Sequence, residues 1–573
     1  MSRDYNIPDS WIKTSIEDVI LYQKGKKPKK LEPIEFENSV PYLDIKAFEK
    51  KEIRQYADTE SSQIIDEQDV VMVWDGARSG WVSKGVNGAL GSTIARFRPF
   101  VFSQKYLYYF LDSQFSYVNS NTKGTGIPHV DPQILWGIEM PLPPFNEQHR
   151  IVSKIEELFS ELDNGVSNLK LSQNQLKVYR QALLKHAFEG KLTEQWRKEN
   201  NPEPAEKLLE RIKEERQKLQ EQEIKEWKAA VKAWEKDGKI GRKPGKPKAS
   251  RVISQIPNEK KALLSELPEG WKWSQSGNLF LYVTSGSRGW ADFYSESGSI
   301  FIRITNLNFD TLDLDLRPEK IQFVIPPDNS EGVRTKVNEG DFLFSITGYL
   351  GMFAIAPKLD DAYVNQHVAL VRPSKLNNLK YLGYWIIAKN GGFYFLNEKN
   401  KGAVKAGLNL NDILEFPIPI CSFEEQNIIS NRLDFQFSII DNLEKTIESG
   451  LQKSEALRQS ILKKAFEGKL VPQDPNDEPA SELLERIQAE KKKYLEEQKQ
   501  QKKRKPKNTK KMSKELSIEE VLKTSDKPML AKDVWQKSKH KENIEDFYKE
   551  LKDIQSKIKE VKKGTESFLS LAK

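Results

Sequence analysis

The chain contains the same helical segment twice, 278 residues apart, and this duplication constrains its architecture more than any other feature. Each copy begins with a Pro-x-Pro segment and a Glu-Gln pair, as PLPPFNEQ from Pro141 and PIPICSFEEQ from Pro417. The hexapeptide AFEGKL then occurs at 187–192 and again at 465–470. We therefore expect two related halves, each with a long helix.

Both copies carry apolar residues at intervals of seven. These positions are Ile155, Leu162, Leu169, Leu176 and Leu183 in the first copy, and Leu433, Ile440, Ile447 and Ile461 in the second, where Ser454 takes the fourth place. Heptad spacing keeps one face of a helix against a partner helix. The pattern predicts two helices of roughly 37 residues, about 55 Å long, packed against each other. Two surface helices on separate cores are the alternative.

Composition narrows the class of protein. With 573 residues, the chain has room for several domains. A net charge of +8 is compatible with a polyanionic partner, although solvated Lys-rich helices also explain it. The single cysteine, Cys421, excludes an internal disulfide and a multi-Cys zinc site. No apolar run reaches membrane-span length and no secretory signal is evident, so we expect a cytoplasmic protein.

The regions before the two helices differ from each other but share landmarks. Both open with Pro-acid-x-Trp, ending at Trp11 and Trp271, and both continue with short strand-like runs and a Gly-rich loop. The expected fold class is α+β, with two mixed α/β domains joined by the two helices in an internal pseudo-twofold repeat. The predicted boundaries are 1–140 and 251–416 for the domains, 141–250 and 417–511 for the helical regions with their basic linkers, and 512–573 for a small C-terminal helical tail.

The motifs and their duplicated order resemble the specificity subunit of type I restriction-modification systems. The resemblance covers about residues 1–510 and rests on PLPPFNEQ, on AFEGKLTEQWR at 187–197, on LLERIKEER at 208–216, on their repeats and on the Pro-x-x-Trp openings. It implies two target recognition domains that each read half of a bipartite, asymmetric DNA site. It also implies that the long helices form an antiparallel coiled coil that sets the half-site spacing.

The resemblance further implies which partners the chain has. Two modification subunits, which methylate adenine at N6 with S-adenosylmethionine, are expected to dock on the helices, and restriction subunits are expected to add ATP- and Mg-dependent translocation and cleavage. No cofactor, metal site or catalytic residue is expected in this chain. The sequence agrees, since no GxxxxGK[ST] phosphate loop occurs and the Pro-Pro strings at 143–144 and 326–327 lack the context of a base-flipping methyltransferase motif.

Candidate DNA contacts come from basic and polar residues in the turns and Gly-rich loops. In the first domain they are Lys24, Lys26, Lys27, Arg78, Ser79, Lys123, Thr125 and His129. In the second they are Ser287, Arg288, Thr347, Tyr349, Asn365, Gln366, His367, Lys401, Lys405 and Asn409. For each of these residues, surface solvation or a turn hydrogen bond is the alternative. For the whole chain, the alternatives are a coiled-coil scaffold whose domains bind protein, and an enzyme acting by itself.

Overall fold

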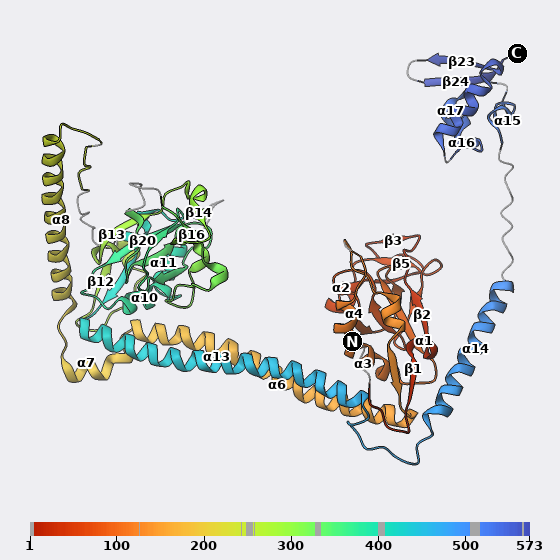
Figure 1. Cartoon of the computed structure of the whole chain (residues 1–573), viewed down its shortest axis with the longest axis horizontal. Helices are drawn as coiled ribbons and strands as arrows, with labels where there is room; N and C mark the ends of the chain where they lie inside the picture. Colours follow the sequence, from red (N-terminus) through yellow and green to blue (C-terminus); the bar gives the residue numbers. More distant parts are fainter. Residues whose placement is uncertain are drawn as a thin grey trace. The chain divides into compact units, whose positions relative to one another are not determined.

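The computed structural model describes residues 5–572 except 125, 242, 248–255, 257, 327–333, 399–406, 505–515, 526, 542 and 564–565. The chain divides into two compact units, Met1–Ile155 with Leu462–Lys573, and Glu156–Ile461 (Figure 1). Both unit boundaries fall inside long helices. Parts of the two predicted basic linkers lie outside the described residues.

Domain 1, the part of unit 1 between Tyr5 and Leu142, is built on two β-sheets and a two-stranded ladder. The four-stranded sheet is antiparallel and has the order β2 (Ile20–Lys24), β10 (Ile94–Pro99), β7 (Val70–Val73) and β8 (Val82–Lys84). The second sheet has the order β3 (Leu31–Glu32), β5 (Tyr56–Asp58), β4 (Ser39–Leu43), β9 (Gly88–Leu90) and β6 (Ile64–Ile65). The ladder pairs β1 (Ile12–Ser15) with β11 (Glu139–Leu142).

Domain 2, the part of unit 2 between Trp271 and Ile420, repeats this plan. Its four-stranded sheet has the order β13 (Phe280–Ser285), β20 (Val368–Pro373), β17 (Phe342–Ser345) and β18 (Phe353–Ile355). Its second sheet has the order β14 (Tyr294–Ser295), β16 (Phe323–Val324), β15 (Ser299–Ile302) and β19 (Ala362–Val364), and its ladder pairs β12 (Lys272–Gln275) with β21 (Pro417–Ile420). Each second sheet contains one parallel pair of strands, which is β4 with β9 in domain 1 and β15 with β19 in domain 2. The predicted α+β class and internal repeat are confirmed.

Short helices accompany the sheets in both domains. They are α1 (Ile16–Val19), α2 (Ile45–Lys50), α3 (Gln104–Ser113), α4 (Phe115–Ser120) and α5 (Pro132–Trp136) in domain 1, and α10 (Leu379–Ile387), α11 (Gly392–Glu398) and α12 (Leu410–Leu414) in domain 2, with α9 (Asn258–Lys261) before it. A polar cap starts each central helix, since Ser103 accepts from the N–H of Tyr106 and Asn378 from that of Tyr381.

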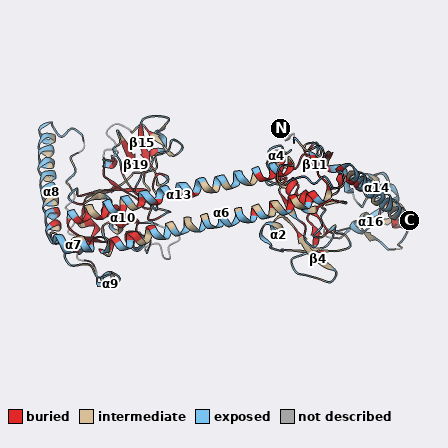
Figure 2. Cartoon of the chain, turned by 90° about the horizontal axis from the view of Figure 1, so that it is seen from below, coloured by how far each residue is buried: buried red, intermediate tan, exposed pale blue. Residues whose placement is uncertain are grey.

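Two helices of 44 residues, α6 (Phe145–Phe188) and α13 (Phe423–Phe466), run antiparallel. Two ion pairs define their register, Arg180 with Asp441 and Arg458 with Asp163. Each arginine also lies over a phenylalanine of the helix that carries its acidic partner, with Cζ 4.6 Å from the Phe437 ring and 4.2 Å from the Phe159 ring. The helices are longer than the predicted 37 residues, and their middle portions are largely exposed (Figure 2).

The nine heptad positions lie on the contacting side of these helices. Ile155, Leu433 and Ile440 are at most 1% exposed, and Leu183, Ile447 and Ile461 are 7% exposed. Leu162, Leu169 and Leu176 are half-buried. At the crossing, a Cβ on Gly450 would lie 3.2 Å from Leu169 Cδ1, so the two helices approach closely there.

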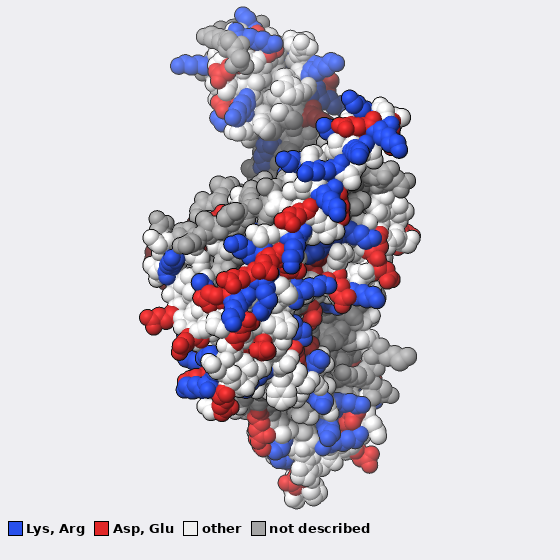
Figure 3. All heavy atoms as spheres, turned by 90° about the vertical axis from the view of Figure 1, so that its left-hand side faces the viewer, with Lys and Arg blue, Asp and Glu red and all other residues white. Residues whose placement is uncertain are grey.

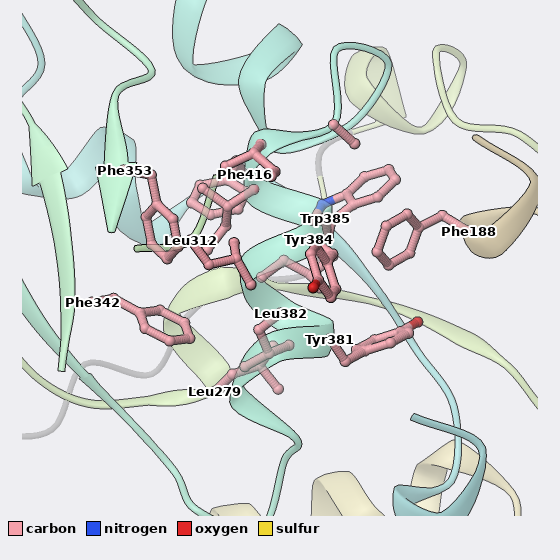
Figure 4. Close-up of a cluster of buried hydrophobic side chains, with 14 of the residues drawn as sticks. Phe188, Leu279, Leu312, Phe342, Phe353, Tyr381, Leu382, Tyr384, Trp385 and Phe416 are labelled. Carbon is pink, nitrogen blue, oxygen red and sulfur yellow. The ribbon is translucent and has the colours of Figure 1, made fainter. Parts of the chain in front are cut away.

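The end of each long helix packs into the domain of the other repeat. Phe188, at the end of α6, contacts Tyr381 and Trp385 of domain 2 with ring centroids 5.2 and 5.0 Å apart (Figure 4). Phe466, at the end of α13, contacts Tyr106 and Phe110 of domain 1 at 5.4 and 5.3 Å. Each AFEGKL motif is therefore the point where one repeat enters the core of the other.

The beginning of each long helix is anchored by a buried Glu-Gln pair. The indole of Trp11 donates to Glu147 at 3.0 Å, and that of Trp271 donates to Glu425 at 2.9 Å. The side chains of Gln148 and Gln426 each accept from a backbone N–H of the adjacent domain at 2.9 Å. These contacts explain why the Glu-Gln pair and the Pro-acid-x-Trp opening recur together.

A second helix follows each long helix, as α8 (Ala205–Lys236), preceded by α7 (Glu194–Asn200), and as α14 (Ala480–Arg504). The first turns of α8 bury Leu208 and Ile212 in the core of unit 2. Tyr494 of α14 packs against Phe100 of domain 1, with ring centroids 6.0 Å apart.

The C-terminal segment forms a small mixed module, so the prediction of helices alone is wrong. Its helices are α15 (Ile518–Leu522), α16 (Ala531–Lys537) and α17 (Ile544–Asp553), and its three-stranded sheet has the order β22 (Met529–Leu530), β24 (Glu566–Leu571) and β23 (Ile558–Lys563). The last helix, α17, ends at Asp553. Beyond it, Ile558, Leu569 and Leu571 alternate with polar residues, and this period of two favours strands.

Candidate nucleic-acid interface

The candidate residues gather where the strands of each four-stranded sheet end, on one side of the sheet. In domain 1, Lys24 at the end of β2 lies opposite Ala95, and Val73 at the end of β7 lies opposite Ile94. The segments after β2 and β7 and before β10 therefore meet at one edge, and the same holds for β13, β17 and β20. We call these the loop edges, formed by residues 24–30, 74–81, 91–93, 121–124 and 126–131 in domain 1, and by 286–289, 346–352, 365–367 and 407–409 in domain 2.

The Gly-rich loop of domain 1 is held against the turn that follows β7. Gly76 N–H donates to Pro128 O at 2.7 Å, and Val130 N–H donates to Trp74 O at 2.9 Å. Lys123 and His129 exchange two backbone hydrogen bonds of 2.8 and 2.9 Å across the loop. The loop is thus joined to the sheet edge, and it brings Lys123 and His129 to the remaining candidates.

Ion pairs occupy two of the candidate lysines. Lys24 Nζ lies 3.0 Å from Asp75, and Lys123 Nζ lies 3.0 Å from Asp131. Burial raises the pKa of Asp131, but hydrogen bonds from Lys123 and from a backbone N–H lower it by more. The pKa of Asp131 is therefore below its usual value. A bound phosphate would have to compete with these carboxylates. Lys26 and Lys27 are exposed on the loop after β2.

Arg78 and Ser79 differ in their surroundings. Arg78 is exposed, pairs with Glu49 and places its guanidinium 4.9 Å from the Trp81 ring. Ser79 is fully buried, and its hydroxyl donates to Gly76 O at 2.7 Å and lies 3.1 Å from Pro128 O. Ser79 therefore secures the Gly-rich loop and presents no polar group at the surface. Thr125 lies outside the described residues.

In domain 2 a histidine lies at the centre of the loop edge. Thr347 Oγ1 is 2.8 Å from His367 Nδ1, and Gln366 Nε2 is 3.0 Å from His367 Nε2. Asn365 is buried and accepts from the backbone N–H of His367 at 3.0 Å. Leu408 N–H donates to Ile346 O at 2.9 Å, so the described end of the second Gly-rich loop meets this edge as the first loop does.

The remaining candidates of domain 2 are mostly exposed. Tyr349 is 72% exposed and Arg288 is exposed, whereas the Ser287 hydroxyl accepts from Arg334 at 2.9 Å. Asn409 caps α12, where its side chain accepts from the N–H of Asn411 at 2.8 Å. Its role is therefore structural. Lys401 and Lys405 lie outside the described residues.

Two glycines that the sequence did not single out fix the shape of both edges. A Cβ on Gly25 would lie 2.0 Å from Gly91 O, and a Cβ on Gly286 would lie 2.2 Å from the carbonyl carbon of Asn365. Only glycine permits this approach of two backbones. Each glycine directly follows the first strand of its sheet, and this shared position is the signal that could have found them.

Aromatic residues pack at the loop edge of domain 1, where Trp74 is buried and Trp81 is half-buried. Tyr22 packs between Trp74 and Trp136 with ring centroids 5.2 and 5.1 Å away, and burial together with Asp75 raises its pKa to about 12. The Tyr22 hydroxyl therefore stays protonated and neutral at physiological pH.

Charge at the surface is mixed in sign. On the face drawn in Figure 3, basic and acidic side chains lie next to one another. Among the described residues, no group of His, Cys, Asp and Glu side chains is arranged to hold a metal ion. Within the same part of the chain, no helix has the length and apolarity needed to span a membrane.

Comparison with known proteins gives matches over most of the chain. The profile of a family described as type I restriction modification DNA specificity domain matches residues 8–171 and 332–453. The type I restriction enzyme EcoBI specificity subunit of Escherichia coli is 24% identical over 502 residues, which cover 85% of this chain and 93% of that protein. The MjaVIII specificity subunit of Methanocaldococcus jannaschii is 32% identical over 185 residues, which cover 32% of this chain and 43% of that protein.

A solved structure from work on complex assembly and conformational transition of the type I R-M system has the same fold. It superposes with a TM-score of 0.55 at 17% sequence identity, over 81% of this chain and 100% of that chain.

Proposed function

We infer that this chain, which belongs to the family of type I restriction-modification specificity subunits, selects the DNA sequence on which a restriction-modification complex acts. As a specificity subunit it is non-catalytic, and methyl transfer and cleavage belong to other subunits. In our proposal, each domain reads one half of a bipartite, asymmetric site through its loop edge.

The observation that carries this proposal is a shared framework with different loop edges. The four-stranded sheets have the same strand order, and in each anchor the buried glutamate accepts from the indole N–H of a tryptophan. At the loop edges, by contrast, Lys24 and Arg78 of domain 1 stand where domain 2 has Ser285 and Leu350. A constant framework with variable edges suits a protein that presents two different base-reading surfaces.

The antiparallel helices are suited to fix the separation between the two half-sites. The 44 residues of α6 correspond to about 66 Å of helix, and ion pairs hold α6 and α13 in register. In the proposal, the gap between the half-sites follows from the length of this pair.

The duplicated surfaces also suggest the stoichiometry of the partners. Because each unit repeats the same junction of domain and helices, two modification subunits have two equivalent places to bind. These subunits would supply S-adenosylmethionine, and restriction subunits would supply the ATP- and Mg-dependent steps, with no cofactor in this chain. We place the complex in the cytoplasm, where it meets duplex DNA.

Domain exchange tests the proposal. Residues 12–142 are replaced by the corresponding domain of a relative of known target, and methylated sites are mapped in a host that carries the modification subunits. We expect one half-site to change to that of the donor, while the other half-site and the gap stay the same. Changes in both halves, or in neither, would refute the assignment of one domain to one half-site.

A further inference from the structure

The distal half of α8 carries a stripe of apolar side chains. Nearer its start, α8 is tied to domain 2, where the Ser374 hydroxyl donates to the Glu215 carboxylate. Beyond that contact, four half-buried residues follow each other at alternating spacings of three and four, namely Ile224, Trp227, Val231 and Trp234. This spacing places all four on one face of the helix. Because most helices in proteins owe their stability to the packing of such a face, a second segment is expected to lie against it.

The chain reverses direction immediately after α8 (Figure 1). The N–H of Lys239 donates to Trp234 O at 2.9 Å, which closes the turn. Gly238, Lys239 and Gly241 have left-handed backbone, with φ of 75°, 63° and 79°. Glycine adopts this conformation without strain, so the sequence favours a reversal at this point. We call the described residues that follow, 238–241 and 243–247, the return segment.

The two tryptophans of the stripe hold the return segment through their indole N–H groups. Trp234 donates to Gly241 O at 3.1 Å, and Trp227 donates to Pro244 O at 3.0 Å. Pro244 and Pro247 are half-buried, whereas the residues between them are exposed. The return segment therefore runs antiparallel to the helix, and every third residue faces the stripe.

A lysine of the return segment lies over each of these rings. Lys243 Nζ is 5.9 Å from the centroid of the Trp234 ring, and Lys246 Nζ is 5.9 Å from that of the Trp227 ring. The face of an indole ring attracts a cation. Each tryptophan therefore makes the same two contacts, a hydrogen bond to a carbonyl group and a cation–π contact with a lysine.

The repetition of these contacts follows from the periods of the two segments. Lys-Pro pairs occur at 243–244 and at 246–247, three residues apart, and the tryptophans are seven residues apart. Three residues of an extended, proline-rich segment advance by about 9 Å. Seven residues of α-helix advance by about 10.5 Å. Successive Lys-Pro pairs can therefore meet successive tryptophans without distortion of either segment.

The second repeat lacks this arrangement. The motif LLERI begins at 208 in α8 and at 483 in α14, so equivalent residues are 275 positions apart, and Lys502 takes the place of Trp227. The start of α8 adjoins domain 2, since Ala205 N–H donates to Gly270 O at 2.9 Å. The chain that leaves the far end of α8 has to come back to this domain, whereas α14 leads on to the C-terminal module. The stripe thus occurs in the repeat whose linker has to return.

We propose that the return segment is a clasp, an intramolecular ligand that the tryptophan face of α8 recognises with one Lys-Pro pair for each tryptophan. The clasp keeps the distal half of α8 helical and directs the chain back toward domain 2. The basic linker after α8 therefore has a binding site within its own unit, and this role does not depend on the DNA sequence that the chain selects.

Hydrogen exchange of the full chain, followed by mass spectrometry, tests the clasp. In W227A/W234A, exchange of peptides from 219–236 should accelerate by at least about tenfold, because two hydrogen bonds and both ring contacts are lost. Alanine is the better helix former, so the substitutions themselves do not disfavour the helix. Peptides from 205–216 and from α14 should exchange as in the unmodified chain, which shows that the rest of the fold is intact.

A pair of lysine variants separates the ring contacts from a general effect of charge. K243Q/K246Q removes both cation–π contacts and should accelerate exchange of 219–236 by about fivefold or more. The matched control K225Q/K228Q removes two lysines that are exposed on α8 itself, and it should exchange like the unmodified chain.

Two results would overturn the proposal. One is unchanged protection of 219–236 in W227A/W234A, which would show that the return segment does not support the helix. The other is unchanged protection in K243Q/K246Q together with a weaker salt dependence of its binding to duplex DNA, which would assign the two lysines to phosphate contacts.

Discussion

Arg197 forms an ion pair with the buried carboxylate of Glu425, whereas in the described residues of unit 1 no arginine occupies the position equivalent to Arg197. The residue 278 places after Arg197 is Pro475. Glu147, the counterpart of Glu425, is 1% exposed and keeps only the indole hydrogen bond in common with it. Arg150, in the next turn of α6, is 2.5 Å from Asp477. Two equivalent anchors therefore differ in electrostatics.

This difference predicts how the stability of unit 1 depends on pH. Burial raises the pKa of Glu147 above the usual glutamate value, outweighing the lowering by Trp11 and Arg150. Because the folded state then binds its proton more tightly than the unfolded state, this glutamate favours folding most at low pH. That contribution is lost as the pH rises through the raised folded pKa. Hydrogen exchange of peptides around Glu147, followed across this range, should show faster opening at higher pH, and E147Q should remove that trend.

The same substitution at the other anchor should have the opposite outcome. Changing Glu425 to Gln leaves the partly buried Arg197 guanidinium without its carboxylate partner. The free energy of unfolding should fall by about 3 kcal/mol, as for other broken buried ion pairs. Hydrogen exchange around 423–430 should accelerate strongly in E425Q at neutral pH, while the region around residue 147 in E147Q should be at least as protected as in the unmodified chain. Equal responses at the two anchors would contradict the asymmetry.

Adjacent isoleucines of α13 separate the contacting face of the helix pair from its exposed face. Ile440 is 1% exposed and Ile439 is 41% exposed. Truncation of Ile440 to Ala should cost about 2–5 kcal/mol of unfolding free energy, because it leaves a cavity in the core. Truncation of Ile439 should cost less than about 0.5 kcal/mol. Denaturant unfolding monitored by circular dichroism compares the two, and similar midpoints would show that the heptad pattern does not mark the packed face.

Two exposed cations at opposite ends of the domain 2 sheet test the position of its loop edge. Arg288 follows β13 at the loop edge, whereas Lys358 follows β18 at the other end. Each Ala substitution removes one positive charge. R288A should weaken binding to the target by about 1–3 kcal/mol, or roughly 5- to 150-fold. K358A should change it little. Competition binding with duplexes altered in one half-site should place the R288A effect in a single half.

Much of the architecture could be predicted from the sequence because it is encoded locally. The heptad positions from Ile155 to Leu183 carry their own period, and the repeated AFEGKL marks where each helix ends. The sequence could not show that Phe188 and Phe466 insert into the core of the opposite repeat. That exchange depends on contacts between residues nearly 200 or more positions apart.

The candidate site was predicted less well, since residue type does not reveal burial. Ser79 lies among suitable polar residues but is fully buried, where its hydroxyl donates to Gly76 O and also lies near Trp74 O and Pro128 O. Asn409 looks like a base-reading amide but caps a helix. The segment after Asp553 is compatible with a helix by sequence, because charged residues such as Lys559 and Glu560 also suit helices, and its pairing with β24 decides the conformation.

Lengthening the helix pair tests most directly the claim that it holds two readers at a fixed separation. Seven residues of a matching heptad are inserted after Lys170 in α6 and after Leu451 in α13, which preserves the antiparallel register. The added length is about 10 Å, or roughly three base pairs. Mapping of methylated sites should give both half-sites unchanged and a gap longer by about three base pairs. Methylation at the original gap, or at altered half-sites, would contradict this account.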